Sequence, residues 1–84
     1  MTAAPTIGGL LGERVRELRK KRGLTQVEFA ALCGVPQSRI STIENGSRVP
    51  NVETVLRLAR ALGCKVTALT SVFDKRDLTA LLSK

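Results

Sequence analysis

The sequence predicts an all-α fold, a compact bundle of about five helices with a helix-turn-helix at its centre. Apolar residues recur at helical spacing through residues 10–62, and capping residues and glycines separate the periodic segments. The loops between these segments are only a few residues long, as in a bundle of antiparallel neighbours. The chain has 84 residues, which suits one small domain without a deep catalytic cleft.

The first predicted helix covers residues 10–22 and follows a flexible leader, residues 1–9, whose Gly pair resists helix formation. Its apolar stripe consists of Leu11, Val15 and Leu18. Its last turn is rich in cations, which suit the negative end of the helix dipole, and Gly23 ends it.

The second helix begins at a capping box formed by Thr25 and Glu28 and runs to about Cys33. Gly34 opens a tight turn, and Pro36 pre-sets the backbone at the start of a third helix. Asn45-Gly46 ends that helix with residues that tolerate positive φ. The side chains predicted to face the core are Phe29, Ala30, Cys33, Ile40 and Ile43.

Asn51 caps a fourth helix that Gly63 closes. Its predicted apolar stripe is Val52, Val55, Leu56, Ala59 and Leu62. A fifth helix is expected from about Val66 to Phe73, completing a domain over residues 10–73, with a short strand as the rival for residues 65–73. Residues 74–84 form a C-terminal extension and a candidate for dimerisation. Its helical turns near 77–82 either pack on a partner subunit or fold back on the core.

The composition excludes several classes of function. The chain has no His, Trp or Tyr, so stacking platforms for single-stranded nucleic acid and Cys-His catalytic pairs are disfavoured. Cys33 and Cys64 lack zinc-ligand spacing and are expected to be small core residues. We therefore expect no enzyme activity, cofactor or metal. Without a signal peptide or transmembrane run, a cytoplasmic protein with no membrane partner is expected.

The charge points to a polyanionic partner, since 14 Lys and Arg outnumber 7 Asp and Glu. Nucleic acid and an acidic membrane face both fit, and ordinary solvated surface charge is the alternative. The surplus is uneven: residues 23–50 carry two cations and two acids, and the excess lies in the flanking segments. Phosphate steering by the flanking cations and a plain charged face stay open for Arg14, Arg16, Lys20, Lys21 and Arg22.

The second and third helices together have the layout of a helix-turn-helix, whose second helix lies in the DNA major groove. Gly34 relieves the sharp turn, and Ala30 must be small because the third helix crosses close by. A helix pair with a Gly at its corner is only a moderate signal, since many non-binding bundles contain one.

Four short segments carry a family resemblance. They are Gly23-Leu24-Thr25-Gln26, Ala30 with Gly34-Val35, Ile43-Glu44-Asn45-Gly46, and Pro50 followed by Leu58-Ala59 and Ala61-Leu62-Gly63. With these segments in this order, residues 10–64 resemble the phage-repressor and Cro-type (XRE-like) helix-turn-helix family. The resemblance implies a lambda-repressor-like fold and binding to double-stranded DNA.

The resemblance also implies roles for individual residues. Gln37, Ser38 and Thr42 would read base edges, while Arg39 would reach either a phosphate or a guanine. Gln26 would bind a phosphate and brace a side chain of the third helix. Further phosphate contacts would come from Asn45, Ser47 and Arg48, and from the amides around Asn45 and Gly46. An Arg19–Glu44 pair would position the helices.

One position departs from the family pattern, because Pro36 stands where a capping Ser or Thr is usual. A cap is worth roughly 1 kcal/mol, and its absence affects how the third helix is aimed. Plainer roles also fit several site residues: Gln26 as a solvated first-turn residue, and Ser38 and Thr42 as ordinary surface hydroxyls.

The leading hypothesis is a DNA-binding transcriptional regulator, a repressor or autoregulator that binds a palindromic operator as a homodimer. Its small size fits restriction-modification controller proteins and antitoxin-type repressors. The alternative is a protein-interaction module whose tail binds a toxin or another partner protein.

Overall fold

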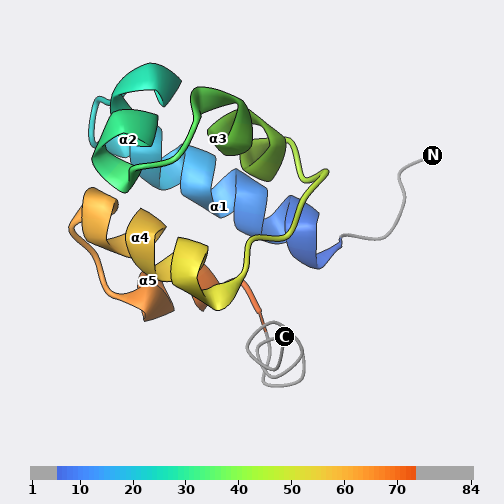
Figure 1. The fold of residues 1–84 in the computed structure, drawn as a ribbon. Coiled ribbons are helices and arrows are strands. Elements are labelled where there is room, and N and C mark those ends of the chain that lie inside the picture. The colour runs from blue at the N-terminus through green and yellow to red at the C-terminus, as the bar shows by residue number, and fades with distance from the viewer. Residues whose placement is uncertain (1–5, 74–84) are drawn as a thin grey trace.

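The computed structural model describes residues 6–73, which form five helices and contain no strand (Figure 1). The helices are α1 (Ile7–Lys21), α2 (Gln26–Cys33), α3 (Gln37–Glu44), α4 (Val52–Leu62) and α5 (Val66–Thr70). Helix α1 runs through the middle of the molecule, with α2 and α3 on one side and α4 and α5 on the other. This architecture confirms the predicted all-α bundle and its central helix-turn-helix.

One apolar core holds the helices together, and every helix contributes to it. Its members are Leu11, Val15, Phe29, Ala30, Cys33, Ile40, Ile43, Val55, Leu58, Ala59, Leu62 and Leu69. Leu56, which the sequence placed in the core, is 48% exposed, and Leu58 is fully buried instead. The buried positions 55, 58, 59 and 62 follow the i, i+3, i+4, i+7 spacing of one helix face, and Leu56 lies off that face.

Helix α1 begins at Ile7, three residues before the predicted start, so the Gly8-Gly9 pair is helical and not part of a leader. Thr6 caps it by accepting a hydrogen bond from the Gly9 amide at 2.9 Å. Glycine is a poor helix former, by about 1 kcal/mol relative to Ala. Packing explains its presence, because a Cβ on Gly8 would lie 2.8 Å from the Gly46 carbonyl oxygen. Tertiary contact thus overrides local propensity; the remainder of the predicted leader, residues 1–5, lies outside the described residues.

The turn between α2 and α3 has the predicted chemistry. Thr25 and Glu28 form both bonds of the capping box, at 3.1 Å and 2.9 Å. Gly34 adopts φ 72°, a left-handed conformation that glycine reaches without a Cβ penalty. Ala30 is 3% exposed beneath the crossing of the two helices. Pro36 occupies the N-cap position of α3 with no side-chain cap bond, as expected for Pro in place of Ser or Thr.

Helix α4 has both of its predicted ends, with Asn51 accepting from the Thr54 amide at 2.9 Å and Gly63 at φ 66°. Residues 66–70 are helical, which confirms the predicted helix over the rival strand, although α5 ends at Thr70. Phe73 lies beyond it, half-buried against the core. The predicted C-terminal extension, residues 74–84, lies outside the described residues.

Candidate nucleic-acid interface

Helix α3 presents a polar face over an apolar underside. Ile40 and Ile43 are fully buried and anchor the helix to the core. Gln37 and Ser38, in the first turn, are exposed, and Ser41 and Thr42 are half-buried. The helix is therefore held by its inner face while its first turn is free to meet a ligand.

A buried ion pair lies where α1 meets the end of α3. Arg19 donates from Nε to Glu44 Oε2 at 2.6 Å and from Nη2 to Glu44 Oε1 at 3.1 Å. Both residues are 7% exposed, and Arg19 Nη1 also donates to the Leu24 carbonyl at 2.7 Å. The structure thus contains the Arg19–Glu44 pair that the family resemblance implied, joining α1, the α1–α2 loop and α3.

The ion pair continues outward through two glutamines. Gln26 Nε2 donates to Glu44 Oε1 at 3.1 Å, and Gln37 Nε2 donates to Gln26 Oε1 at 2.7 Å. These bonds use one of the two hydrogens on each amide nitrogen. Gln37 keeps its carbonyl oxygen and a second N–H, which are the groups that a bidentate contact with adenine requires. The bracing of a third-helix side chain by Gln26, implied by the resemblance, is present in this geometry.

Thr42 and Arg39 are less open than the sequence suggested. The Thr42 hydroxyl donates to the Arg39 carbonyl at 2.9 Å, so toward a ligand it offers only its acceptor lone pairs and its methyl group. Arg39 and Arg48 line a hollow of about 250 Å³ beside the start of α4, together with Val49, Pro50, Asn51 and Thr54.

The segment after α3 is tied by its own hydrogen bonds. The amides of Asn45 and Gly46 donate to the Ser41 and Ile43 carbonyls, at 3.0 Å and 3.1 Å. The Ser47 amide donates to Asn45 Oδ1 at 2.9 Å, and its hydroxyl lies against the same oxygen. These amides are therefore not free for DNA. In this segment, the groups that can contact a phosphate are the side-chain NH₂ of Asn45 and the exposed guanidinium of Arg48.

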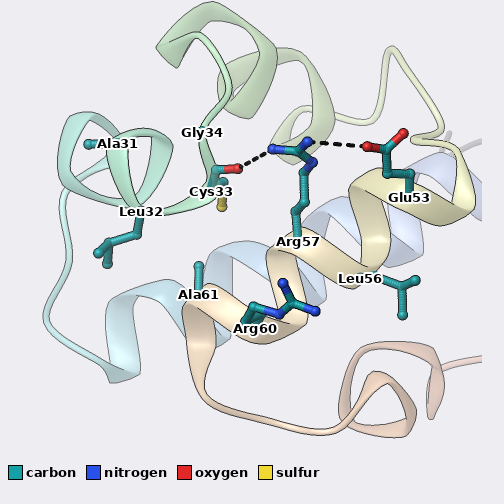
Figure 2. A pocket seen from close by; sticks show the side chains of 9 residues that line it. All are labelled: Ala31, Leu32, Cys33, Gly34, Glu53, Leu56, Arg57, Arg60 and Ala61. Atoms are coloured by element: carbon teal, nitrogen blue, oxygen red, sulfur yellow. Dashed lines mark hydrogen bonds and ion pairs between the residues drawn. The ribbon is translucent and has the colours of Figure 1, made fainter.

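Three arginines serve the fold in a way that the sequence did not reveal. Arg14 Nε donates to the Ala68 carbonyl at 2.8 Å, and Arg22 Nη1 donates to the Leu62 carbonyl at 2.7 Å. Arg57 bridges the Cys33 carbonyl, at 3.3 Å, and the Glu53 carboxylate, at 3.2 Å (Figure 2). Helix ends leave carbonyls without intrahelical partners. Which arginine reaches them depends on tertiary distances, so no local sequence signal identifies these three.

A hollow of about 630 Å³ lies between the last turn of α2 and α4 (Figure 2). Leu32 and Leu56, which are 61% and 48% exposed, lie on it beside Arg57 and Arg60, and no residue of α3 lines it. Burial raises the pKa of the Cys33 thiol to about 11, and the neighbouring Arg57 charge offsets part of that shift. A thiol with this pKa stays protonated and unreactive at neutral pH.

The geometry of α2, its tight turn and α3 is that of a helix-turn-helix, and comparison with known proteins agrees. The sequence pattern of a helix-turn-helix family matches residues 15–69. The chain belongs to the XRE-type helix-turn-helix family. This is a family of DNA-binding transcription regulators and not an enzyme class. None of the helices within residues 6–73 combines the length and the apolar character needed to cross a membrane.

The chain is 39% identical over 66 residues to the uncharacterised HTH-type transcriptional regulator y4dJ of Sinorhizobium fredii, covering 79% of this chain and 86% of that protein. It is 49% identical over 63 residues to the putative antitoxin HigA2 of Mycobacterium tuberculosis, covering 74% of this chain but only 62% of that protein. Among solved structures it resembles the restriction-modification controller protein C.AhdI of Aeromonas hydrophila, with a TM-score of 0.72 at 35% identity, covering 74% of this chain and 94% of that one.

Proposed function

We propose that this protein is a sequence-specific DNA-binding regulator of transcription that inserts α3 into the major groove. The observation that carries the proposal is the hydrogen-bonded chain from Arg19 through Glu44 and Gln26 to Gln37. It fixes an exposed amide at the leading end of α3, where a small positional error would spoil a base contact. Because the Gln37 amide is already held in place, less side-chain entropy is lost when the protein binds DNA.

The polar face of α3 suits base discrimination better than simple attraction. Gln37 can pair with adenine N6 and N7, and such a bidentate pair is worth roughly 1–3 kcal/mol against a wrong base. Ser38 is exposed beside it, and Thr42 adds a methyl group and acceptor lone pairs one turn later. Because Lys side chains bind phosphates whatever the sequence, a first turn that begins with uncharged Gln37 and Ser38 and carries only one cation, Arg39, favours selectivity over affinity.

The proposed regulator acts as a homodimer on a palindromic operator. A two-fold dimer presents two copies of α3, so half-sites about one helical turn apart are expected. The likeness to a restriction-modification controller protein supports a small regulatory protein, and we expect its operator to lie near a promoter. Repression or autoregulation by occlusion of polymerase is the simplest outcome of such binding. We place the protein in the cytoplasm, with its DNA.

The experiment is selection of bound duplexes from a random DNA pool, using the full chain at about 0.15 M salt. The selected sequences should contain an inverted repeat, and the protein should bind them at least a hundredfold more tightly than a scrambled duplex. Affinity should also fall steeply with salt, because phosphate contacts release counterions. Selected pools with no shared sequence, or a response indifferent to salt, would contradict the proposal.

A second candidate is a protein-interaction module that binds a toxin or another partner protein. The likeness to a putative antitoxin favours it. So does the hollow between α2 and α4, since its exposed Leu32 and Leu56 lie away from α3. Co-expression with the product of a neighbouring reading frame tests this candidate. A stoichiometric complex that Leu32→Lys disrupts without loss of DNA binding would support it, and no complex would count against it.

A further inference from the structure

The cations of the described residues fall into two groups, and only one is available to a ligand. Four arginines donate to backbone carbonyls and are committed to the fold: Arg14, Arg19, Arg22 and Arg57. The others have no hydrogen bond or ion pair within residues 6–73: Arg16, Lys20, Lys21, Arg39, Arg48, Arg60 and Lys65. The net charge of the chain therefore overstates the positive charge that is available to bind a ligand. Where each free cation lies decides which ligand it can contact.

Arg16 is the free cation that lines the hollow between α1, α2 and α3. This hollow, of about 110 Å³, is lined by Arg16 from α1, Gln26 from α2, Ser41 and Glu44 from α3, and Asn45 just beyond α3. A liquid water takes up about 30 Å³, so the hollow has room for a group the size of a phosphate. Three segments distant in sequence converge on it.

The side chains around the hollow have hydrogen-bond donors to spare. Gln26 Nε2 uses one hydrogen on Glu44 and keeps the second. Asn45 turns its amide oxygen to Ser47, which leaves its NH₂ group without a partner among the described residues. The Ser41 hydroxyl and the Arg16 guanidinium likewise make no bond there. Four residues of the lining therefore carry spare donor groups.

The one acid in the lining does not oppose an anion. Both carboxylate oxygens of Glu44 already accept from Arg19, and Oε1 also accepts from Gln26. The Glu44 side chain is only 3% exposed, so its charge is both paired and covered. Within residues 6–73 the unpaired charge at the hollow is the Arg16 guanidinium, and an oxyanion is the ligand that complements it.

We propose that this hollow binds one phosphate of the DNA backbone and that Arg16 and Ser41 are binding residues for it, joining Gln26 and Asn45. The inference rests on the proposed function and adds residues that the family resemblance did not imply. Gln26 belongs both to the hollow and to the bonded chain that holds Gln37. A phosphate seated here would therefore set the register of α3 in the groove.

The test compares Arg16→Ala and Ser41→Ala with the matched control Lys20→Ala, an exposed cation of α1 that does not line the hollow. Dissociation constants are measured on a selected and a scrambled duplex over a range of salt. Arg16→Ala should weaken both duplexes by the same factor, on the order of tenfold per protomer. It should also reduce the salt slope by about one per protomer, while Lys20→Ala should have a clearly smaller effect on both quantities. Ser41→Ala should cost roughly two- to fivefold. Thermal unfolding of each variant checks that it is folded.

Single neutral methylphosphonate substitutions in the selected duplex then locate the contact. Neutralising one particular phosphate in each half-site should weaken binding of the wild-type chain. The same DNA substitution should have little further effect on binding of Arg16→Ala, which already lacks the contact. The proposal fails if Arg16→Ala behaves like Lys20→Ala, or if both chains give the same substitution profile. Failure of the proposed function is a separate result, since the wild type would then not prefer the selected duplex. Arg16→Ala and Lys20→Ala on the scrambled duplex would still test the hollow.

Discussion

Helix α4 carries its own start and stop signals, whereas α3 relies on residues from other parts of the chain. Asn51 caps α4 through a bond to the Thr54 amide, and Gly63 ends it. Helix α3 begins at Pro36 without a side-chain cap. Its alignment depends instead on the bonds of Glu44 and Gln37 to α1 and α2. The helix proposed to read DNA is thus more exposed than α4 to disturbance by single substitutions in distant parts of the chain.

The largest expected effect comes from Glu44→Ala, which leaves the Arg19 guanidinium buried and unpaired. Breaking a buried ion pair in this way costs roughly 3–5 kcal/mol of unfolding free energy. The matched control is Glu53→Ala in α4, whose bond to Arg57 lies at the surface with the two side chains 73% and 47% exposed. Exposed pairs are worth at most about 1 kcal/mol. Urea unfolding of both variants measures the contrast, and equal losses would refute the difference between the two helices.

A second, smaller effect is expected where α1 meets the end of α3. A Cβ on Gly12 would lie 2.2 Å from the Ile43 carbonyl oxygen, so Gly12→Ala must push the helices apart. We expect a loss of about 1–3 kcal/mol. Gly9→Ala is the control, because its Cβ would meet only Thr6 Oγ1, at 3.1 Å, and Ala favours the helix. The unfolding temperature of Gly9→Ala should lie near that of the wild type. An equally stable Gly12→Ala would contradict the close contact between α1 and the end of α3.

The smallest effects concern the caps themselves. Asn51→Ala should cost about 1 kcal/mol, since α4 loses its N-cap bond. Pro36→Ser gives α3 a cap of similar worth but releases the unfolded chain from the constraint of Pro, an opposing term of about 0.4–1 kcal/mol. We therefore expect Pro36→Ser to lie within about 0.5 kcal/mol of the wild type. Chemical denaturation measures the unfolding free energy of Asn51→Ala and Pro36→Ser. A large loss of unfolding free energy in Pro36→Ser would mean that Pro stabilises α3 more than a side-chain cap does.

The features predicted from sequence are those with a local cause. Thr25, Gly34, Asn51 and Gly63 marked helix ends because capping and positive φ depend on neighbours in the chain. The start of α1 was missed because Gly8 makes room for Gly46, a contact that no local pattern encodes.

The candidate site also contains some features that could be predicted from the sequence and others that depend on tertiary contacts. The Arg19–Glu44 pair and the bracing of a third-helix side chain by Gln26 followed from the family resemblance, and the structure contains both, with Gln37 as the braced residue. The grouping of Arg16 and Ser41 with Gln26 and Asn45 depends on where three helices converge. So does the assignment of Arg14, Arg22 and Arg57 to backbone carbonyls, which composition alone would count as DNA-binding charge.

The central claim is that Gln37 reads a base because Gln26 holds it in place. A double-mutant cycle with Gln26→Ala and Gln37→Ala, measured as binding free energy on the selected duplex, tests this directly. Gln37→Ala alone should cost roughly 1–3 kcal/mol there while leaving binding to a scrambled duplex nearly unchanged. After Gln26→Ala the further loss from Gln37→Ala should shrink by about 1 kcal/mol, because coupled residues are not additive. Losses that add within about 0.5 kcal/mol, or that are equal on the two duplexes, would contradict the claim.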